Sequence, residues 1–246
     1  MRVYGKSDVG KARDNNQDFY IISPPDTRIK IYVVADGMGG AKGGEIASKL
    51  AALSAKSYIE THFDEYRADR NKLKTLISNA IEYANMIVYE ESKKDKSLKG
   101  MGTTIDICLI YNNQVFIGHV GDSRVYRIRK EAIKKLTTDH SLVQKLIDDG
   151  EISKEEAKSH PQKNQILKAV GCDAYVEPDV QINGFIESDI LLMCSDGLTN
   201  MVSDTTIYDV IRENNIINEE KIVNKLIDLA NDNGGMDNTT IVLIAK

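Results

Sequence analysis

The segment that decides the fold is residues 104–128, TIDICLIYNNQVFIGHVGDSRVYRI. Three short runs in it are rich in β-branched residues and predict strands, at Thr104–Ile110, Val115–Val120 and Arg124–Ile128. Asn112-Asn113, between the first two runs, predicts a hairpin turn. Strands joined by so few residues must be antiparallel, because a parallel pair needs a crossover of about a dozen residues. The segment therefore predicts an antiparallel meander.

The rest of the chain adds strands and helices on both sides of this meander. Further strands are predicted at Ile29–Ala35, Asp189–Cys194 and Thr239–Ala245, and a further turn at Arg129-Lys130-Glu131. Apolar residues that recur every three or four positions predict helices over Glu45–Ile59, Leu73–Val88, Asp204–Arg212 and Glu219–Ala230. This order of elements indicates an α+β domain in which helices cover the sheets, and it does not fit a doubly wound parallel sheet.

Residues 139–171 differ from the rest of the chain because Lys, Glu, Asp and Gln dominate them. A short helix is predicted over Ser141–Asp148, with Leu142 and Leu146 facing inward. A second is predicted over Ser153–Lys158, where Ser153 is a suitable N-cap with Glu156 three residues later. We interpret the segment as a polar flap on one domain that spans residues 1–246.

Composition excludes several classes of protein. The chain has 246 residues, with 32 Lys and Arg against 37 Asp and Glu, and this net charge of −5 does not suit binding to nucleic acid. No apolar run approaches the roughly 18 residues of a membrane span, and the first residues lack the features of a signal peptide. Three cysteines, Cys108, Cys172 and Cys194, form no CxxC pair, so we expect free, buried thiols in a cytoplasmic protein.

Aspartates stand at the ends of four predicted strands. They are Asp36, which is followed by Gly37, Asp122, Asp196 and Asp237. A single aspartate at a strand end is usually a turn former, and four independent turns remain an alternative. Because these strands are expected to pack together, we expect the four carboxylates to converge at one rim of the fold.

Clustered carboxylates call for a cation. They raise one another's pKa unless a positive charge neutralises them. Hard oxygen ligands without His or Cys at ligand spacing select Mg²⁺ or Mn²⁺. Two such ions about 3.5–4 Å apart lower the pKa of a shared water towards neutrality, and Gly37 would let a backbone carbonyl come close as a further ligand. The pattern therefore predicts metal-assisted hydrolysis of a phosphate ester.

Three other uses of the glycine loop after Asp36 fail. A dinucleotide fingerprint needs a third glycine where Lys42 stands, and a Walker loop needs Ser or Thr where Gly43 stands. An aspartyl-phosphate enzyme would need a second aspartate at Met38. A thiol phosphatase is excluded as well, because neither Cys172 nor Cys194 has an arginine six residues later.

Seven sequence blocks occur in the order found in one family. The chain from about Gly5 to Ile244 resembles the metal-dependent protein phosphatases of the PPM family, in the bacterial form of type 2C. The blocks are Arg13–Asp18, Val34–Gly40, Gly102–Thr104, Val120–Arg124, Thr138–Ser141, Cys194–Leu198 and Asp237–Thr240. The resemblance implies a four-layer α-β-β-α sandwich of two mainly antiparallel sheets flanked by helix pairs. It also implies hydrolysis of phosphoserine and phosphothreonine in proteins at a binuclear Mn²⁺ or Mg²⁺ centre, without a phosphoenzyme intermediate.

The same resemblance implies a role for each aspartate. Asp36 would bridge both ions, and the carbonyl of Gly37 would bind the second ion. Asp196 and Asp237 would complete the first ion's ligands. Asp122, together with Asp196, would hold a weaker third ion.

Further roles follow from the same family. Asp18 would orient the attacking water, and Arg13 would clamp the substrate phosphate with its planar fork of donors. Met38 stands where animal members often carry a histidine, so no side chain is assigned to protonate the leaving group. His119, within an apolar strand, is expected to be a packed, hydrogen-bonded residue.

The family also suggests partners, namely phosphorylated proteins that include a serine/threonine kinase, and a monomeric state. The alternative function is a catalytically silent module that binds phosphoproteins on the same fold. Degenerate members of that kind would lose metal ligands, whereas every expected ligand is present in this chain.

Overall fold

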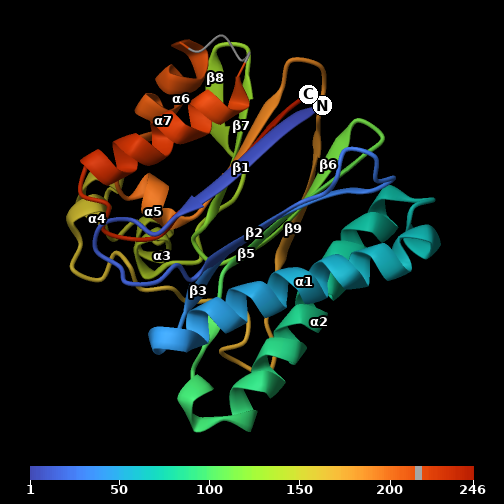
Figure 1. The fold of residues 1–246 in the computed structure, drawn as a ribbon, viewed down its shortest axis with the longest axis horizontal. Helices are drawn as coiled ribbons and strands as arrows, with labels where there is room; N and C mark the ends of the chain where they lie inside the picture. The colour runs from blue at the N-terminus through green and yellow to red at the C-terminus, as the bar shows by residue number, and fades with distance from the viewer. Residues whose placement is uncertain (214–217) are drawn as a thin grey trace.

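Two antiparallel sheets pack face to face, and a pair of helices covers the outer side of each (Figure 1). The computed structural model describes residues 1–213 and 218–246. One sheet, called here the β11 sheet, has the strand order β1-β11-β10-β7-β8. The other, the β3 sheet, has the order β2-β3-β5-β6-β9, with β4 beside β3. All described strand pairs are antiparallel, and the α+β sandwich expected from the family is confirmed.

The strand bounds are as follows. The β11 sheet consists of β1 (Arg2–Asp8), β7 (Arg124–Arg129), β8 (Ala132–Lys135), β10 (Ile190–Cys194) and β11 (Thr239–Ala245). The β3 sheet consists of β2 (Asp18–Ile22), β3 (Lys30–Met38), β4 (Gly102–Thr103), β5 (Ile105–Tyr111), β6 (Gln114–Val120) and β9 (Asp179–Gly184).

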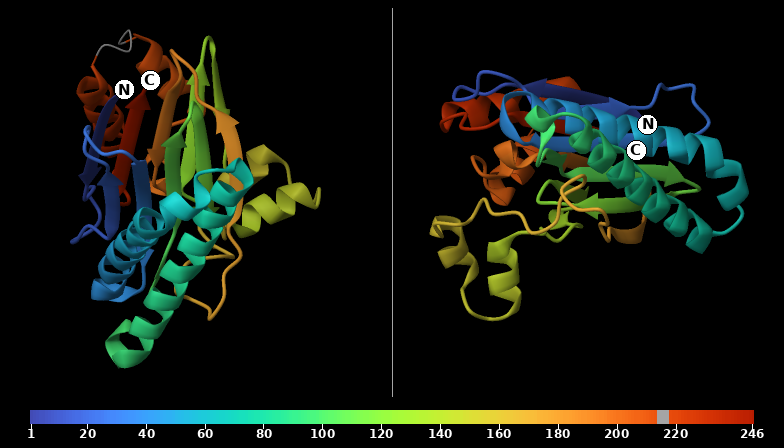
Figure 2. Two further views of the ribbon diagram at one scale, coloured as in Figure 1. Left: turned by 90° about the vertical axis from the view of Figure 1, so that its right-hand side faces the viewer. Right: turned by 90° about the horizontal axis from the view of Figure 1, so that it is seen from below.

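The helices form two outer layers and a projection. The long helices α1 (Gly40–Tyr66) and α2 (Arg70–Lys94), followed by the 3-10 turn η1 (Lys96–Leu98), cover the β3 sheet. On the β11 sheet lie α6 (Asp204–Glu213) and α7 (Glu219–Asp232), with the short α5 (Asp196–Thr199) after β10. The flap helices α3 (Leu142–Asp148) and α4 (Lys154–Ser159) project from the body (Figure 2).

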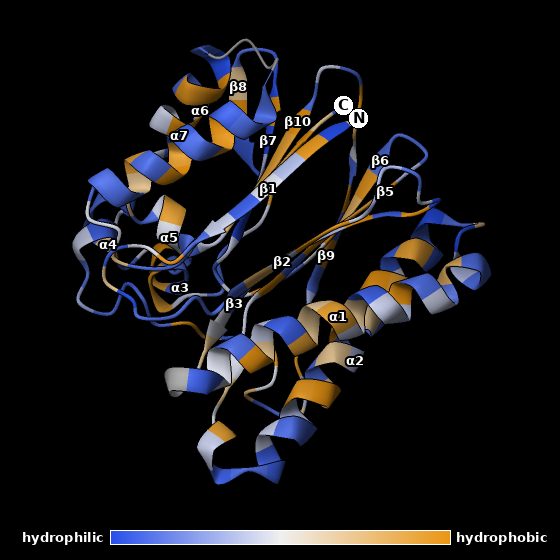
Figure 3. Ribbon diagram, in the orientation of Figure 1, coloured by the Kyte–Doolittle hydropathy of each residue, from blue (hydrophilic) through white to orange (hydrophobic). Residues whose placement is uncertain are grey.

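Both faces of the internal strands are buried, which explains their continuous apolar runs. Along β10, Ile190, Leu192 and Cys194 face the helices, whereas Leu191 and Met193 face the other sheet. The strands are accordingly apolar along most of their length, while the helices carry apolar and polar stripes (Figure 3). Three apolar clusters thus hold four layers together, one between the sheets and one under each helix pair.

All six predicted strands exist, and each lies inside a sheet. Both predicted turns exist too, with positive φ values of 48° and 59° at Asn112 and Asn113 and of 54° at Lys130. The strands that the sequence did not predict are the edge strands β1, β2, β8 and β9 and the two-residue β4. The edge strands carry mostly half-buried or exposed side chains, so their apolar signal is weak.

The four predicted helices exist but α1 and α2 are longer. Helix α1 begins at Gly40, five residues before the apolar periodicity, and this first turn was not predicted because it is rich in glycine and carries no apolar pattern. A Cβ on Gly37 would lie 2.1 Å from the carbonyl oxygen of Gly44, so this turn packs directly on the end of β3. Helix α2 is capped by Asp69, whose side chain accepts a hydrogen bond from the backbone of Asn71.

The flap agrees with the sequence in part. Ser153 and Glu156 form the predicted capping box at the start of α4. Leu142 and Leu146, expected to face inward, are only half-buried, because α3 projects from the body and none of its residues is fully buried. Cys108 and Cys194 are free and buried as expected, but Cys172 is exposed because it lies in the loop that leaves the flap. In the described part of the chain no helix is long and apolar enough to cross a membrane.

Candidate metal centre

Asp36 lies near the end of β3, and its backbone is held on both sides. Its N–H donates to Oγ1 of Thr104 at 3.0 Å, and its carbonyl oxygen accepts from the hydroxyl of Thr103 and the N–H of Thr104, both at 2.8 Å. The Thr104 hydroxyl also shares a hydrogen bond of 2.7 Å with Ser123, directly after Asp122. These bonds fix the strand ends that carry Asp36 and Asp122 relative to each other.

Asp18 joins the cluster from the neighbouring strand. It lies opposite Asp36 in the register of β2 and β3. Its Oδ2 accepts a hydrogen bond of 2.7 Å from the hydroxyl of Ser195, which precedes Asp196. Ser195 in turn accepts from the backbone N–H of Thr240 on β11 at 2.9 Å. One serine therefore connects the carboxylates of the two sheets.

The carboxylates of this cluster are electrostatically strained. Burial raises the pKa of Asp36 well above its usual range, and the charges of Asp18, Asp196, Asp122 and Asp237 raise it further. Burial raises the pKa of Asp18 to about 7, and the nearby charges of Asp196 and Asp237 act in the same direction. Burial and the charge of Asp196 likewise raise the pKa of Asp122 to about 7.

The pKa of Asp196 is raised as well. Burial raises its pKa, and the charge of Asp237 adds to the effect, while hydrogen bonds with Asp36 and Asn200 offset part of it. The five aspartates expected at the site are thus close enough to influence one another. The structure thus brings these aspartates within electrostatic reach of one another, and their role as metal ligands stays a prediction.

Asp237 and Arg13 form an ion pair at the mouth of the cluster. Nη2 of Arg13 lies 2.7 Å from Oδ2 of Asp237, and the two side chains are 52% and 34% exposed. Oδ1 of Asp237 accepts from the N–H of Asn238 at 2.9 Å. The guanidinium expected to clamp phosphate is therefore beside the carboxylates, with a carboxylate as its present partner.

Three buried oxygens in the cluster have no hydrogen-bond partner. They belong to Asp18, Asp122 and Asp196, in each case the Oδ1 atom. A buried anionic oxygen without a partner is costly, and a divalent cation satisfies several such oxygens at once. The donor set is composed of hard carboxylate oxygens, which fit Mn²⁺ or Mg²⁺.

The carboxylates nevertheless stand apart. Among the described residues, no three His, Cys, Asp or Glu side chains are already gathered tightly enough to hold an ion. The residues present fit a divalent centre chemically, and ion binding would have to draw them together.

Several positioning residues were not singled out from the sequence. Ser195 connects Asp18 to β11, and Thr104 holds Asp36. Asn238 holds the loop before β2, because its side chain donates to the carbonyls of Val9 and Asn15 and accepts from the N–H of Gln17. All three lie within the sequence blocks quoted above, so their hydroxyl and amide groups beside the aspartates were the available signal.

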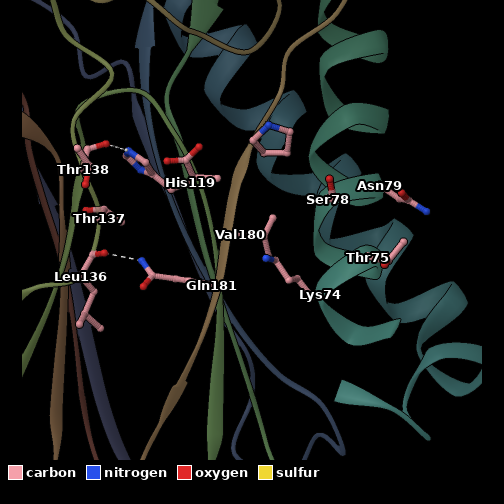
Figure 4. A pocket seen from close by; sticks show the side chains of 12 residues that line it. Lys74, Thr75, Ser78, Asn79, His119, Leu136, Thr137, Thr138, Val180 and Gln181 are labelled. Atoms are coloured by element: carbon pink, nitrogen blue, oxygen red, sulfur yellow. Dashed lines mark hydrogen bonds between the residues drawn. The ribbon is translucent and has the colours of Figure 1, made fainter. Parts of the chain in front are cut away.

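A cavity of about 610 Å³ lies elsewhere, beside β9 and α2 (Figure 4). Its lining includes Lys74, Ser78, His119, Thr138 and Gln181, and none of the clustered carboxylates. This cavity is therefore separate from the cluster of buried carboxylates.

Comparison with known proteins agrees with this geometry. The family described as Protein phosphatase 2C matches residues 9–229. The chain belongs to the protein phosphatase 2C family. This membership confirms the resemblance seen in the sequence, and it makes the chain a metal-dependent protein phosphatase.

Relatives cover the chain over its full length. The serine/threonine phosphatase stp of Listeria monocytogenes is 38% identical, over 100% of this chain and 96% of that protein. The solved serine/threonine phosphatase of S. agalactiae is 36% identical with a TM-score of 0.90, over 100% of this chain and 99% of that one. The catalytic domain of the phosphatase PstP, solved in complex with two manganese ions, is 33% identical with a TM-score of 0.84, over 98% and 96% of the two chains.

Proposed function

We propose that this phosphatase hydrolyses phosphoserine and phosphothreonine in proteins at a centre of two Mn²⁺ or Mg²⁺ ions, without a phosphoenzyme intermediate. The observation that carries the proposal is the cluster of buried aspartates with unpartnered oxygens beside one arginine. When bound, such a centre supplies a water activated near neutral pH and a positive charge for the phosphoryl oxygens. The manganese ions of the related PstP domain support the choice of metal.

In this proposal the aspartates divide into ligands and an orienting residue. Asp36, Asp196 and Asp237 would hold the two ions together with the carbonyl of Gly37, and Asp122 would join Asp196 at a weaker third site. Asp18 is fixed by Ser195 through Oδ2, which leaves Oδ1 to accept a hydrogen bond from the attacking water.

Arg13 binds the substrate phosphate in the same proposal. Its side chain is half-exposed and already directed at the cluster by Asp237. A planar guanidinium binds two phosphate oxygens at once, so the phosphate can replace Asp237 as its partner. Met38 carries no ionisable group, so protonation of the leaving hydroxyl is left without a side-chain donor.

The wider context is proposed from the family. Phosphorylated proteins, among them a serine/threonine kinase, are the proposed substrates, and the chain is proposed to act as a cytoplasmic monomer in signalling. The proposed domain is one catalytic unit over residues 1–246 with the flap at 139–171. Three free thiols support a reducing compartment.

Turnover of p-nitrophenyl phosphate and of a phosphothreonine peptide tests the proposal. We expect Mn²⁺ to support both reactions and EDTA to abolish them. Asp36→Asn and Asp237→Asn should each lose turnover, while Asp26→Asn, at an exposed aspartate away from the cluster, should retain it. Manganese binding without hydrolysis of either ester would favour the alternative of a silent phosphoprotein-binding module.

The flap has its own test. If it governs access of protein substrates, substitutions on α3 and α4 should change peptide hydrolysis more than hydrolysis of the small ester. An unchanged ratio of the two activities would count against a role for the flap in selectivity.

A further inference from the structure

Two histidines lie between the carboxylate cluster and the base of the flap, and the proposed function uses neither. His119 is on β6 and 1% exposed, as expected for a packed residue, and His140 follows β8. Their rings are 4.7 Å apart between centroids and tilted by 38°. This pair is the only contact between two histidine rings in the part of the chain that the structure describes.

His140 holds Gly121 through both of that residue's backbone groups. The N–H of His140 donates to the carbonyl oxygen of Gly121 at 2.7 Å. The N–H of Gly121 donates to Nδ1 of His140 at 3.1 Å. Because Nδ1 accepts a hydrogen bond, the proton of the neutral ring is on Nε2, which lies 3.4 Å from Oδ2 of Asp179.

The residue that His140 holds is directly before Asp122. Gly121 has φ +113°, and a Cβ there would lie 2.5 Å from the side chain of Thr104, so the backbone turns sharply against its neighbour. The direction of this turn determines where the carboxylate of Asp122 points. Asp122 is buried and its Oδ1 has no partner, so the carboxylate depends on its backbone for orientation.

His119 holds the segment from which His140 comes. Its Nδ1 shares a hydrogen bond of 2.7 Å with Oδ1 of Asp106. Its Nε2 donates to the carbonyl oxygen of Thr138 at 2.9 Å, a bond drawn in Figure 4. A carbonyl oxygen only accepts, so Nε2 of His119 carries a proton at all times. The chain from Asp106 through His119 to Thr138 therefore sets the position of His140.

The surroundings keep His140 neutral. Burial lowers the pKa of His140 to about 4, and the charge of His119 and of Lys168 acts in the same direction, while Asp179 opposes it. Nδ1 is thus available to accept the Gly121 N–H at neutral pH. On its other side, the carbonyl oxygen of His140 accepts from the N–H of Leu167 at 2.7 Å, at the flap base.

We propose that His140 is a positioning residue that orients the Asp122 carboxylate for metal binding by clamping the backbone of Gly121, with His119 holding His140 in place. The proposal rests on the proposed role of Asp122 as a ligand of the weakest ion. It adds that binding of this ion also requires Nδ1 of a neutral His140 as a hydrogen-bond acceptor, although His140 is not itself a metal ligand.

Two substitutions separate this role from simple packing. His140→Leu keeps an apolar side chain of similar volume but removes the acceptor. His140→Asn keeps an acceptor, because the amide oxygen takes the place of Nδ1. We expect His140→Leu to weaken the weakest Mn²⁺-binding step by about 10-fold in calorimetric titration, as loss of an outer-shell partner does, and His140→Asn to restore it to within about 3-fold.

His160→Leu is the matched control. His160 also accepts a backbone N–H through Nδ1, from Gln162 at 3.2 Å, but it lies on the flap away from the cluster. It should bind Mn²⁺ like the unaltered protein. Cooperative urea unfolding of each metal-free variant shows that it is folded before binding is compared.

A double variant tests whether His140 acts through Asp122. Asp122→Asn alone should lose the weakest binding step, and adding His140→Leu should weaken Mn²⁺ binding no further. Nitrogen-15 NMR of the unaltered protein provides a readout without metal, in which His140 should appear as the neutral Nε2–H tautomer at pH 6.5.

The outcomes are distinct. Four results would each overturn the positioning role. Folded His140→Leu could bind Mn²⁺ as tightly as the unaltered protein, or His140→Asn could bind it as weakly as His140→Leu. The losses of Mn²⁺ affinity could add fully in the double variant, or NMR could show a proton on Nδ1 of His140. None of these results bears on the turnover of Asp36→Asn, which tests the proposed function, so the proposed function would stand. Turnover by Asp36→Asn would instead refute the proposed function, whatever His140 does.

Discussion

The molecule contains two groups of buried carboxylates that differ in their partners. Asp139 accepts three bonds from Arg124, at 3.1 Å to Oδ1 and at 3.0 and 2.7 Å to Oδ2, and a fourth from Lys135 at 3.1 Å. Asp189 is held by Arg129 through two bonds of 2.6 Å. In the cluster at the rim, by contrast, Asp18, Asp122 and Asp196 each leave one oxygen without a partner.

The pKa values follow this difference. Burial acts to raise the pKa of Asp139 and of Asp189, but the paired arginines bring both below the usual range. Burial and mutual repulsion raise the pKa of Asp18, Asp36, Asp122 and Asp196, and the charge of Arg124, which acts against this at Asp122 and Asp196, does not offset it. The paired carboxylates therefore have a compensating charge within the fold, whereas the clustered ones lack one, as the proposed cation site would require.

The substitution Asp36→Asn tests the contrast between the two groups of carboxylates most strongly. Loss of the carboxylate that is proposed to hold both ions should lower turnover by about 10³-fold or more, because metal-assisted activation of water would fail. The same change should raise the free energy of unfolding of the metal-free protein, since it removes the most strongly desolvated charge of the cluster. Phosphopeptide kinetics and urea unfolding in EDTA measure the two effects. Lower stability of the metal-free variant would show that Asp36 is not strained.

The opposite substitution addresses the paired group. Arg129→Met leaves Asp189, a fully buried carboxylate, without its guanidinium. Breaking a buried pair costs about 3–5 kcal/mol, and because the Arg129 side chain is 30% exposed we expect about 2 kcal/mol. Urea unfolding gives the loss, and turnover of p-nitrophenyl phosphate should be unchanged below the unfolding range. A large loss of turnover would mean that this pair also serves the site.

The pH dependence of stability distinguishes the two groups in one experiment. The clustered aspartates have a raised pKa in the fold, so the folded state binds more protons and metal-free stability falls as pH rises from about 4 towards 7. Each proton held only by the fold contributes a slope of about 1.4 kcal/mol per pH unit. Asp139 and Asp189 have a lowered pKa, so their contribution is lost as pH falls below about 4.

Urea unfolding in EDTA between pH 3 and pH 8 measures this profile. Stability should pass through a maximum near pH 4–5, and saturating Mn²⁺ should remove the decline at higher pH because it neutralises the cluster. A metal-free protein that gains stability from pH 4 to pH 7 would contradict the raised pKa values.

The sequence predicted the interior of the fold better than its edges. Internal strands such as β10 and β11 are buried on both faces, so their apolar runs are unmistakable. Edge strands such as β1 and β9 have one open side and mixed side chains, and only pairing with a neighbour makes them strands. Strand pairing and register depend on residues far apart in the chain, so a local sequence pattern does not reveal them.

The candidate site was also only partly predictable from the sequence. Aspartates at strand ends were visible as residues, and the fold brings them close together. The partners of those residues were not visible, because Ser195 meets Asp18 across 177 residues of chain and Arg13 meets Asp237 across 224. The clamp of His140 on Gly121 is of the same kind, since it depends on β6 and the flap base lying side by side.

Arg13 shares a feature with each group of carboxylates, and its substitution gives the smallest expected loss of activity among these predictions. Like Arg129 it pairs with an aspartate, yet its pair is half-exposed and belongs to the cluster. We expect Arg13→Ala to lower kcat/KM for a phosphothreonine peptide by about 10-fold, the value of one charge-assisted contact, through a higher KM.

Mn²⁺ affinity decides between the two duties that this arginine can have. If Arg13 serves the substrate, its loss should raise KM and weaken inhibition by inorganic phosphate, because both depend on binding the phosphoryl oxygens. If it serves only to restrain Asp237, its loss should free that carboxylate and tighten Mn²⁺ binding while KM stays the same. Steady-state kinetics at saturating Mn²⁺, with phosphate inhibition and a calorimetric Mn²⁺ titration, therefore distinguish a substrate clamp from one more structural pair. Arg13→Lys sharpens the result, because a lysine keeps the charge but not the fork, and a clamp that needs two parallel bonds should be only partly restored.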